Sequence, residues 1–325
     1  MALKVVLTDG PFSDTSIEEE ILGQIGATLT RAPGSSVSEI AALAADADAL
    51  LVCWANIPAE LIRQLKRCRY IALYTAGFNN VDLAAATEAG IAVSNNPGYC
   101  IEEVAAHSLA LLLACHRRLF ILESHVKSGV WAPVASMQPT PALREQTVGI
   151  LGYGRNGRQL AEWVAPLCGR VIAHSKDPEL SAQDALPAEV VSLDQLLRES
   201  DYISIHLPLN ESTRHLLGRE EFAKMKPTAY LINTSRGLIL AEDALLAALR
   251  ARQIAGAALD VFTTEPLPPD HPFRTMPNVI ITPHVAWYSA RSEYRLHANA
   301  PRAIVDFFQG RPVKLLNQPK LTVDS

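Results

Sequence analysis

Three side chains with complementary chemistry follow consecutive β-rich runs in the second half of the chain: Arg236, Glu265 and His284. An arginine binds a carboxylate and a carbonyl oxygen through its fork of N–H donors. A histidine gives or takes a hydroxyl proton near neutral pH, and a neighbouring glutamate orients the imidazole and favours its charged form. Together these groups suit the reduction of a 2-keto acid, with Arg236 as the substrate anchor and His284–Glu265 as the acid/base pair.

Each of the three also has an ordinary structural explanation when taken alone. Arg236 could contact a phosphate or solvent at the surface, Glu265 could cap a helix before the following proline, and His284 could be a buried histidine with satisfied hydrogen bonds. Because ligands bind beyond the carboxyl ends of the strands in open α/β sheets, residues at consecutive strand ends converge on one edge. Their shared position therefore favours a catalytic site.

A glycine-rich loop follows the first predicted strand of this half, Val148–Leu151. Residues 152–157 form a G-x-G-x-x-G that comes directly after the strand and opens a helix over 156–167. The first glycine would allow a tight turn, the second would let the backbone approach a pyrophosphate, and the third would let helix and strand pack closely. The helix N-terminus would add N–H donors to the phosphates. We expect this loop to bind a dinucleotide through Gly152, Tyr153, Gly154, Arg155, Asn156 and Gly157.

The end of the next strand bears on which nicotinamide cofactor is bound. An NAD site usually places an acidic residue there for the ribose hydroxyls, but this chain has Ser175, with Lys176 beside it. Loss of the carboxylate removes repulsion of a 2′-phosphate, and the cation adds attraction. The sequence therefore leans towards NADP(H), with NAD(H) possible. The alternative is that Asp177 reaches back to the ribose, or that Lys176 points only to water.

The elements that must position these groups alternate between short β-rich runs and helical stretches. Such alternation builds parallel sheets, so we predict an α/β protein with two doubly wound parallel-sheet domains, a Rossmann cofactor domain and a flavodoxin-like domain. One helical stretch over 101–129 links them, and 130–141 is irregular. The predicted strands are Val5–Leu7, Ala27–Leu29, Ala49–Val52, Tyr70–Leu73, Ile91–Val93, Val148–Leu151, Val171–Ala173, Tyr202–Ile205, Tyr230–Ile232, Ala257–Leu259 and Val279–Ile281.

Composition excludes several classes of protein. The 325 residues suit about two domains, and 49% hydrophobic against 19% charged residues is too apolar for a disordered chain. A net charge of −5 without a long basic run argues against nucleic acid and anionic membranes. The longest apolar stretch, 109–115, is too short to span a bilayer, and the N-terminus is typical of a strand rather than a signal peptide. We expect a soluble cytoplasmic protein.

Metal and thiol chemistry find little support. The five cysteines are scattered and include no C-x-x-C, which argues against a disulfide framework or a zinc site. His107, His116 and His125 recur every nine residues, a spacing that points neighbours to nearly opposite sides of a helix, so they do not form a metal site. Cys100 has no evident base to activate it. No metal is expected.

The motifs together resemble the D-isomer-specific 2-hydroxyacid dehydrogenase family, over almost the whole chain. Within that family they look most like the branch related to the C-terminal-binding proteins. The segments that carry this closer likeness are Thr8–Phe12, Asn96–Cys100, Glu102–Ala105 and His284–Ser289.

The resemblance implies a division into domains and an assembly. The substrate domain would comprise residues 1–100 and 290–325, and the dinucleotide-binding Rossmann domain residues 101–289. Two helices would hinge the domains. A homodimer formed through the cofactor domain would be the expected assembly, with a small 2-keto or 2-hydroxy acid as the substrate.

The resemblance also implies further site residues. Ala76 and Gly77 match the loop whose backbone N–H groups bind the substrate carboxylate, although Thr75 and Asn79 stand where a glycine and an aspartate are common. Trp287 matches a side chain that walls the substrate pocket, with ordinary packing as the alternative. Asp260 matches the aspartate that binds the nicotinamide carboxamide. The remaining cofactor-lining positions are Leu207, Pro208, Thr234, Ser235, Arg236 and His284.

Two rival functions stay open at this stage. Formate or phosphite oxidation uses the same scaffold, but formate-oxidising relatives carry glutamine where Glu265 stands, and formate has no hydroxyl proton to remove. The Glu265–His284 pair does not discriminate between phosphite oxidation and keto-acid reduction. A redox-sensing scaffold of the corepressor type, with weak turnover, is the other rival, although only Leu315–Ser325 could serve as a docking tail.

Overall fold

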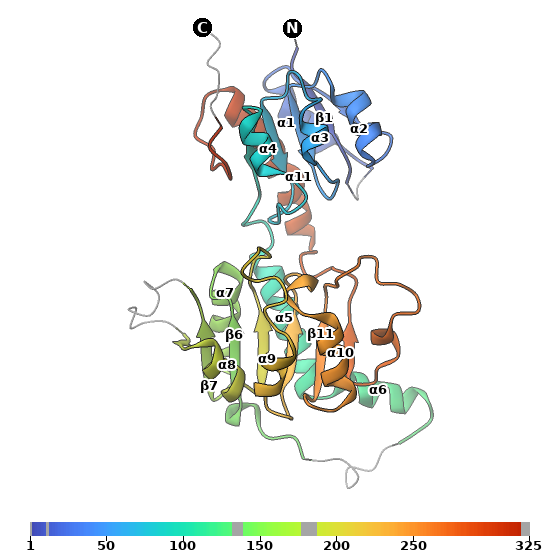
Figure 1. Ribbon diagram of the computed structural model, residues 1–325, viewed down its shortest axis with the longest axis vertical. Coiled ribbons are helices and arrows are strands. Elements are labelled where there is room, and N and C mark those ends of the chain that lie inside the picture. The colour runs from blue at the N-terminus through green and yellow to red at the C-terminus, as the bar shows by residue number, and fades with distance from the viewer. Residues whose placement is uncertain (1, 11–12, 132–138, 177–186, 320–325) are drawn as a thin grey trace. The chain divides into compact units, whose positions relative to one another are not determined.

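The structure is a computed structural model that describes residues 2–10, 13–131, 139–176 and 187–319 (Figure 1). The chain divides into two compact units. Unit 1 comprises Met1–Cys100 and Ser289–Ser325, and unit 2 comprises Ile101–Tyr288. The two-domain α/β fold class predicted from the sequence is confirmed.

Unit 1 is a parallel sheet with five strands among its described residues, in the order β2-β1-β3-β4-β5. The three strands β1, β3 and β4 are almost entirely buried apolar runs, as expected where helices cover both faces. The edge strand β2 is largely exposed. The strands are β1 (Lys4–Leu7), β2 (Thr28–Arg31), β3 (Ala49–Val52), β4 (Tyr70–Leu73) and β5 (Ala92–Ser94). The helices between them are α1 (Ser16–Gly23), α2 (Val37–Ala44), α3 (Ala59–Ile62) and α4 (Leu83–Glu88).

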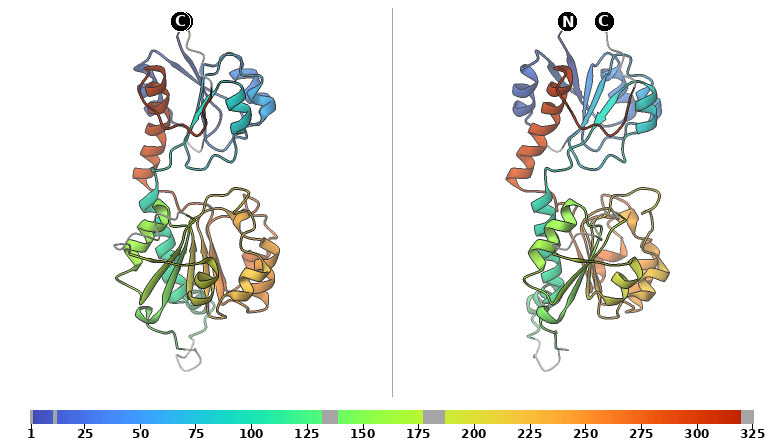
Figure 2. Two further views of the ribbon diagram at one scale, coloured as in Figure 1. Left: turned by 60° about the vertical axis from the view of Figure 1, so that its left-hand side comes forward. Right: turned by 90° about the vertical axis from the view of Figure 1, so that its left-hand side faces the viewer.

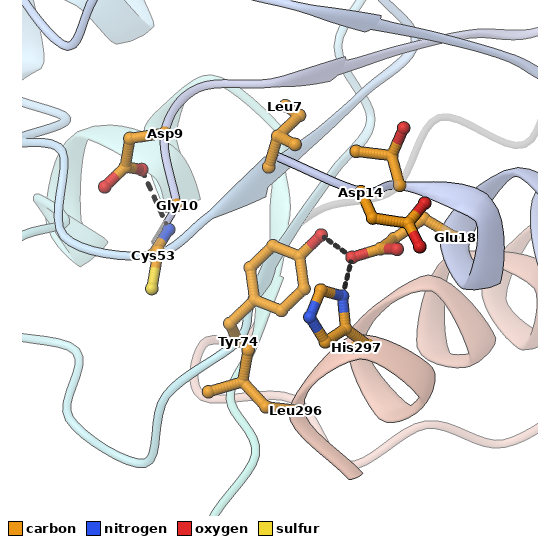
Figure 3. A pocket seen from close by; sticks show the side chains of 10 residues that line it. Leu7, Asp9, Gly10, Asp14, Glu18, Cys53, Tyr74, Leu296 and His297 are labelled. Atoms are coloured by element: carbon orange, nitrogen blue, oxygen red, sulfur yellow. Dashed lines mark hydrogen bonds and ion pairs between the residues drawn. The ribbon is translucent and has the colours of Figure 1, made fainter. Parts of the chain in front are cut away.

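The last helix of the chain, α11 (Ala290–Phe308), packs against α1 and closes unit 1. Glu18 of α1 joins three elements that are distant in sequence. Its Oε1 accepts hydrogen bonds from the Tyr74 hydroxyl at 2.9 Å and from His297 Nδ1 of α11 at 2.6 Å (Figure 3). Burial and the neighbouring Glu18 raise the pKa of Tyr74 well above its ordinary value, so the phenol stays protonated and donates. This buried cluster holds the C-terminal helix in place.

Unit 2 is a parallel sheet with seven strands among its described residues, in the order β12-β11-β10-β9-β6-β7-β8. Helices cover both faces, with α5 and α7 packed together on one side and α8, α9 and α10 on the other (Figure 2). The strands are β6 (Thr147–Leu151), β7 (Arg170–His174), β8 (Glu189–Val190), β9 (Tyr202–Ile205), β10 (Tyr230–Asn233), β11 (Gly256–Leu259) and β12 (Val279–Ile281). The helices are α5 (Ile101–His116), α6 (Leu119–Lys127), α7 (Arg155–Val164), α8 (Leu193–Glu199), α9 (Arg219–Lys224) and α10 (Glu242–Arg250).

The structure differs from the sequence prediction in two elements of unit 2. The single helical stretch over 101–129 is two helices, α5 and α6, bent by 62° at Arg118, whose backbone is left-handed (φ 52°). A left-handed residue cannot continue a right-handed helix. The strand β8 was not predicted, because two half-exposed residues at a sheet edge carry no apolar pattern. Most of the irregular segment 130–141 lies outside the described residues.

In the described ranges, no single helix has the length and apolar composition needed to cross a membrane, although the bent pair α5–α6 passes that test as a pair. No group of three or more histidine, cysteine or acidic side chains in those ranges could hold a metal ion. All five cysteines fall within the described ranges, are buried, and form no disulfide.

Candidate active site

Close backbone packing shapes the glycine loop after β6. Gly152 has φ +104°, and a Cβ there would lie 2.7 Å from the backbone of His206. A Cβ on Gly157 would lie 2.2 Å from the carbonyl oxygen of Gly152, so the helix α7 packs directly on the turn. Gly154 instead faces open space, with nothing within 4 Å of a Cβ built on it. Two glycines thus allow close packing, and the third leaves room beside the N-terminus of a ten-residue helix.

At the end of β7, the predicted cofactor-selecting residues are accessible. Ser175 is half-buried and Lys176 is exposed. Lys176 Nζ donates to Ser212 Oγ at 3.1 Å, which brings a cation and a hydroxyl together beside the strand end. Asp177, the alternative ribose partner, lies outside the described residues.

The turn after β10 is built by Asn233, whose fully buried side chain folds the backbone around itself. Its Oδ1 accepts from the Ser235 amide at 3.0 Å, and its Nδ2 donates to the Arg236 carbonyl at 3.0 Å. Ser235 Oγ donates to the Leu207 carbonyl at 3.0 Å, so the turn is tied to the neighbouring strand end. The half-buried Arg236 side chain bends back to donate from Nη1 to the Ser235 carbonyl at 2.7 Å.

Close packing brings this turn against the segment that follows β11. A Cβ on Gly237 would lie 2.0 Å from the carbonyl carbon of Phe262, so only glycine fits at this contact. Glu265 follows three residues after Phe262, and its Oε1 accepts from the Phe262 amide at 2.9 Å. The backbone that follows Arg236 therefore packs against the segment that carries the carboxylate, and the charge of Arg236 acts on Glu265.

Glu265 and His284, which the sequence pattern nominates as an acid/base pair, are in direct contact. His284 Nδ1 lies 2.6 Å from Glu265 Oε2, and both side chains are partly exposed. Burial acts to raise the pKa of Glu265, but the hydrogen bond and charge of His284, the Phe262 amide and the charge of Arg236 outweigh it and lower the pKa below its ordinary value. The carboxylate thus stays ionised, and Nε2 is left as the ring nitrogen that can exchange a proton.

The loop that carries His284 is organised around Asp260, which is fully buried at the end of β11. Its Oδ1 accepts from the Thr282 hydroxyl at 2.5 Å and from the Val285 amide at 3.0 Å, and its Oδ2 accepts from the Ala286 amide at 2.9 Å. The side chain of Trp287 adds a further tie, because its Nε1 donates to the His284 carbonyl at 3.1 Å. His284 itself has a left-handed backbone, with φ 53°.

Comparison with known proteins identifies the family to which this chain belongs. The D-isomer specific 2-hydroxyacid dehydrogenase NAD binding domain matches residues 109–286. Glyoxylate reductase of Aeropyrum pernix is 41% identical over 287 residues, covering 86% of each chain. Glyoxylate/hydroxypyruvate reductase B of Shigella boydii is 36% identical, covering 86% of this chain and 87% of its own. The chain belongs to the D-isomer specific 2-hydroxyacid dehydrogenase family.

Solved structures agree with this membership of the 2-hydroxyacid dehydrogenase family. The structure of a glyoxylate reductase from Paecilomyes thermophila has a TM-score of 0.85 at 27% identity, covering 97% of this chain and 98% of that one. The protein is accordingly an oxidoreductase that transfers a hydride between a nicotinamide cofactor and a 2-keto or 2-hydroxy acid.

The structure of this dehydrogenase gathers one set of the predicted site residues at one edge of the sheet of unit 2, and a second set belongs to unit 1. The strand ends of unit 2 place Arg236, Asp260, Glu265 and His284 along adjacent strands, in the order β10, β11, β12. Leu207, Pro208, Thr234 and Ser235 lie at the ends of β9 and β10 in the same unit. Tyr153 is buried, whereas Arg155 is exposed at the start of α7 and Asn156 is half-buried. Ala76 and Gly77 belong to unit 1.

In unit 1, side chains on either side of Ala76 and Gly77 donate hydrogen bonds to the carbonyls of these two residues, in the loop after β4. Thr75 Oγ1 donates to the Gly77 carbonyl at 2.9 Å, and Asn95 Nδ2 donates to the Ala76 carbonyl at 2.6 Å. Thr75 thus stabilises the loop through its hydroxyl.

Sequence reasoning missed His107 in this dehydrogenase. It was considered only as part of a nine-residue histidine repeat, yet its Nε2 lies 3.1 Å from Thr282 Oγ1, at the base of the loop that carries His284. The two residues are 175 positions apart. No local pattern could have paired them.

Proposed function

We propose that this dehydrogenase reduces a small 2-keto acid, glyoxylate-sized, with His284 as the proton donor. The observation that carries the proposal is the 2.6 Å contact between His284 Nδ1 and Glu265 Oε2, on a loop next to the turn of Arg236. Glu265 orients the imidazole through Nδ1, and His284 Nε2 gives its proton to the oxygen that was the keto carbonyl. In the reverse direction the same nitrogen takes the hydroxyl proton.

The other proposed contacts hold the substrate. The Arg236 guanidinium binds the substrate carboxylate and polarises the keto oxygen through its fork of donors. The amides of Ala76 and Gly77 add donors to the carboxylate, and Trp287 limits the size of the group next to the keto carbon. We propose a compact 2-keto acid because the relatives of this chain include a glyoxylate reductase and a glyoxylate/hydroxypyruvate reductase, whose named substrates are small.

The cofactor site is proposed at the carboxyl edge of the sheet of unit 2, which we propose as the cofactor domain, with unit 1 as the substrate domain. The nicotinamide, when bound, supplies or accepts the hydride. The amides at the start of α7 and the open space at Gly154 suit the pyrophosphate. The proposed contacts are Gly152, Tyr153, Gly154, Arg155, Asn156, Gly157, Ser175, Lys176, Leu207, Pro208, Thr234, Ser235, Arg236, Asp260 and His284.

Steady-state reduction of glyoxylate, hydroxypyruvate and pyruvate, each with NADPH and NADH, tests the function. We expect turnover with at least one of these acids at a rate of about 1 s⁻¹ or more, as is ordinary for enzymes. Rates that stay far below this for every keto acid would favour the corepressor-like redox scaffold, to which the branch resemblance pointed. Oxidation of formate or phosphite at a higher rate would favour the other rival.

The preference for NADP(H) is proposed from Ser175, Lys176 and Ser212. A serine in place of a carboxylate, next to a cation and a second hydroxyl, suits a 2′-phosphate. We expect Ser175→Asp to raise KM for NADPH about tenfold or more and to leave KM for NADH unchanged or lower. The matched control is Ser175→Asn, which keeps the size of the side chain without its charge. A tenfold preference of the wild-type protein for NADH would overturn this part of the proposal.

A homodimer formed through unit 2 is proposed from the helix α6 and the residues after it. None of the residues of α6 is buried within unit 2, although several are apolar. Val126 is 55% exposed and Trp131 86% exposed. An exposed apolar surface of this kind is typical of an interface, and the family resemblance makes a second copy the expected partner. Sedimentation equilibrium should give a dimer, and Val126→Asp should shift the equilibrium towards monomer. A monomeric wild-type protein would contradict this proposal.

A cytoplasmic location of the protein stays a prediction.

A further inference from the structure

The backbone of His284 needs external support. A left-handed conformation is unfavourable for a non-glycine residue, and it persists only where neighbouring groups impose it. The His284 amide donates to the Asp260 carbonyl at 2.9 Å, and the two following amides, of Val285 and Ala286, donate to the Asp260 carboxylate. Three successive amides of the loop thus bind one residue. Whatever fixes Asp260 also fixes the proton-transfer group.

The Asp260 carboxylate is in turn held from the side of α5. The Thr282 hydroxyl donates its hydrogen bond to Asp260 Oδ1, so towards the ring of His107 its oxygen can only accept. The proton of His107 must therefore sit on Nε2, which lies 3.1 Å from Thr282 Oγ1 and 3.7 Å from Asp260 Oδ1. A directed chain of donors runs from the ring of His107 through the threonine to the buried carboxylate.

The helix α5 has a second contact of the same kind. Ser108, the next residue, lies with its Oγ 2.8 Å from the buried Thr234 Oγ1 at the end of β10. Consecutive residues of one helix therefore contact two strand ends of the candidate site, β12 through Thr282 and β10 through Thr234. This helix serves as a fixed base for the loops that carry the site.

We propose that His107 is a positioning residue for proton transfer: through Thr282 and Asp260 it maintains the left-handed backbone that aims the His284 ring. This inference rests on the proposed role of His284. His107 contacts neither of the other catalytic candidates, Arg236 and Glu265, in any hydrogen bond of the described residues. Its contribution is to the geometry of the loop, and a misplacement of about 1 Å at a reacting group can cost on the order of a hundredfold in rate.

The first test compares His107→Leu with His107→Gln, in which the amide Nε2 keeps a donor at a similar reach. We expect His107→Leu to lower kcat about tenfold or more with KM for the cofactor unchanged, and His107→Gln to recover most of the loss. The matched control is His116→Leu on the same helix. That histidine is buried and hydrogen bonds to Tyr202, so its loss should lower the thermal midpoint without lowering kcat per folded molecule.

A double-mutant cycle with Thr282→Val separates a shared role from two independent ones. If His107 acts only through Thr282, the double variant should be no slower than the slower single variant. Additive losses, or an unchanged kcat in His107→Leu, would overturn the proposal. Should His107→Leu not fold, the comparison of Thr282→Val with Thr282→Ser tests the same chain of donors with the imidazole in place.

Amide hydrogen exchange gives a readout that needs no turnover. In His107→Leu the amides of Val285 and Ala286 should exchange faster, while in His116→Leu they should keep wild-type protection. Equal protection in His107→Leu and the wild type would overturn the proposal, whatever the substrate is. A wild-type protein without turnover on any keto acid would instead overturn the proposed function and leave this measurement valid.

Discussion

Among the described residues, Glu18–His297 in unit 1 and Glu265–His284 in unit 2 share the same contact, Nδ1 to carboxylate at 2.6 Å. Their surroundings differ. The side chains of the first pair are 2% and 10% exposed, and those of the second are 35% and 41% exposed. Identical hydrogen-bond geometry therefore serves packing in one unit and suits proton exchange in the other.

The placement of each pair explains the difference. His297 lies in the middle of a long helix and joins it to α1, whereas His284 lies on a loop at the carboxyl edge of a sheet. Tyr74 donates to the carboxylate of the first pair, and Arg236 acts on that of the second through its charge. A short contact between an acid and an imidazole thus indicates a catalytic pair only when a ring nitrogen can reach a ligand.

The largest effect is expected at the exposed pair, from His284→Asn. Asparagine tolerates a left-handed backbone, so the loop should keep its shape while the proton donor is lost. Reduction should slow by about 10²–10⁴-fold in kcat, with an unchanged near-ultraviolet circular dichroism spectrum. A variant that keeps more than a tenth of the wild-type kcat would show that His284 is not the proton donor.

The buried pair should respond in stability instead. His297→Leu removes the imidazole from the buried carboxylate of Glu18 and leaves the Tyr74 hydroxyl as donor, which costs about 3 kcal/mol in the free energy of unfolding. Chemical denaturation measures this loss, and kcat per folded molecule should stay unchanged. The double variant Glu18→Leu/His297→Leu, which removes both groups, should recover part of the stability. Equal stability of His297→Leu and the wild type would contradict the assigned role.

A smaller effect on rate is expected from Glu265→Gln. The amide keeps a hydrogen-bonding group beside the imidazole but carries no negative charge to support the ring as it exchanges a proton, so kcat for reduction should fall about tenfold or more. Because the pKa of Glu265 lies below its ordinary value of 4.5, the wild-type carboxylate stays ionised at pH 5 and protonates only below that lowered value. The loss of wild-type rate that follows from protonation of Glu265 should therefore begin only below pH 4.5, and it should be absent from the variant. An acid decline that is the same in both proteins would remove Glu265 from the pair.

The smallest effect is expected from Tyr74→Phe. The change removes one of two hydrogen bonds to the Glu18 carboxylate and should cost about 1 kcal/mol in the free energy of unfolding. The hydroxyl is neutral at all ordinary pH values because burial raises the pKa of Tyr74, so the loss should be the same at pH 6 and pH 9. A loss that grows with pH would indicate that the tyrosine ionises.

Much of the fold followed from local patterns. Continuous apolar runs such as Ala49–Val52 gave the strands, and their alternation with helices gave parallel sheets. The break at Arg118 was missed, since the apolar pattern continues on both sides of it and a single left-handed residue has no signature. The edge strand β8 was too short to carry a pattern.

The sequence by itself determined which residues follow each strand, because an apolar strand and a glycine loop are both local patterns of adjacent residues. That sufficed to nominate Arg236, Glu265 and His284. Only the tertiary structure decided that one carboxylate, Asp260, organises the loop that carries His284, and that His107 contacts the base of this loop through Thr282. It also decided that the Glu18–His297 pair is buried and the Glu265–His284 pair partly exposed. Such partners are 175 or 279 positions apart, and contacts over that range arise only when packed helices and sheets bring the segments together.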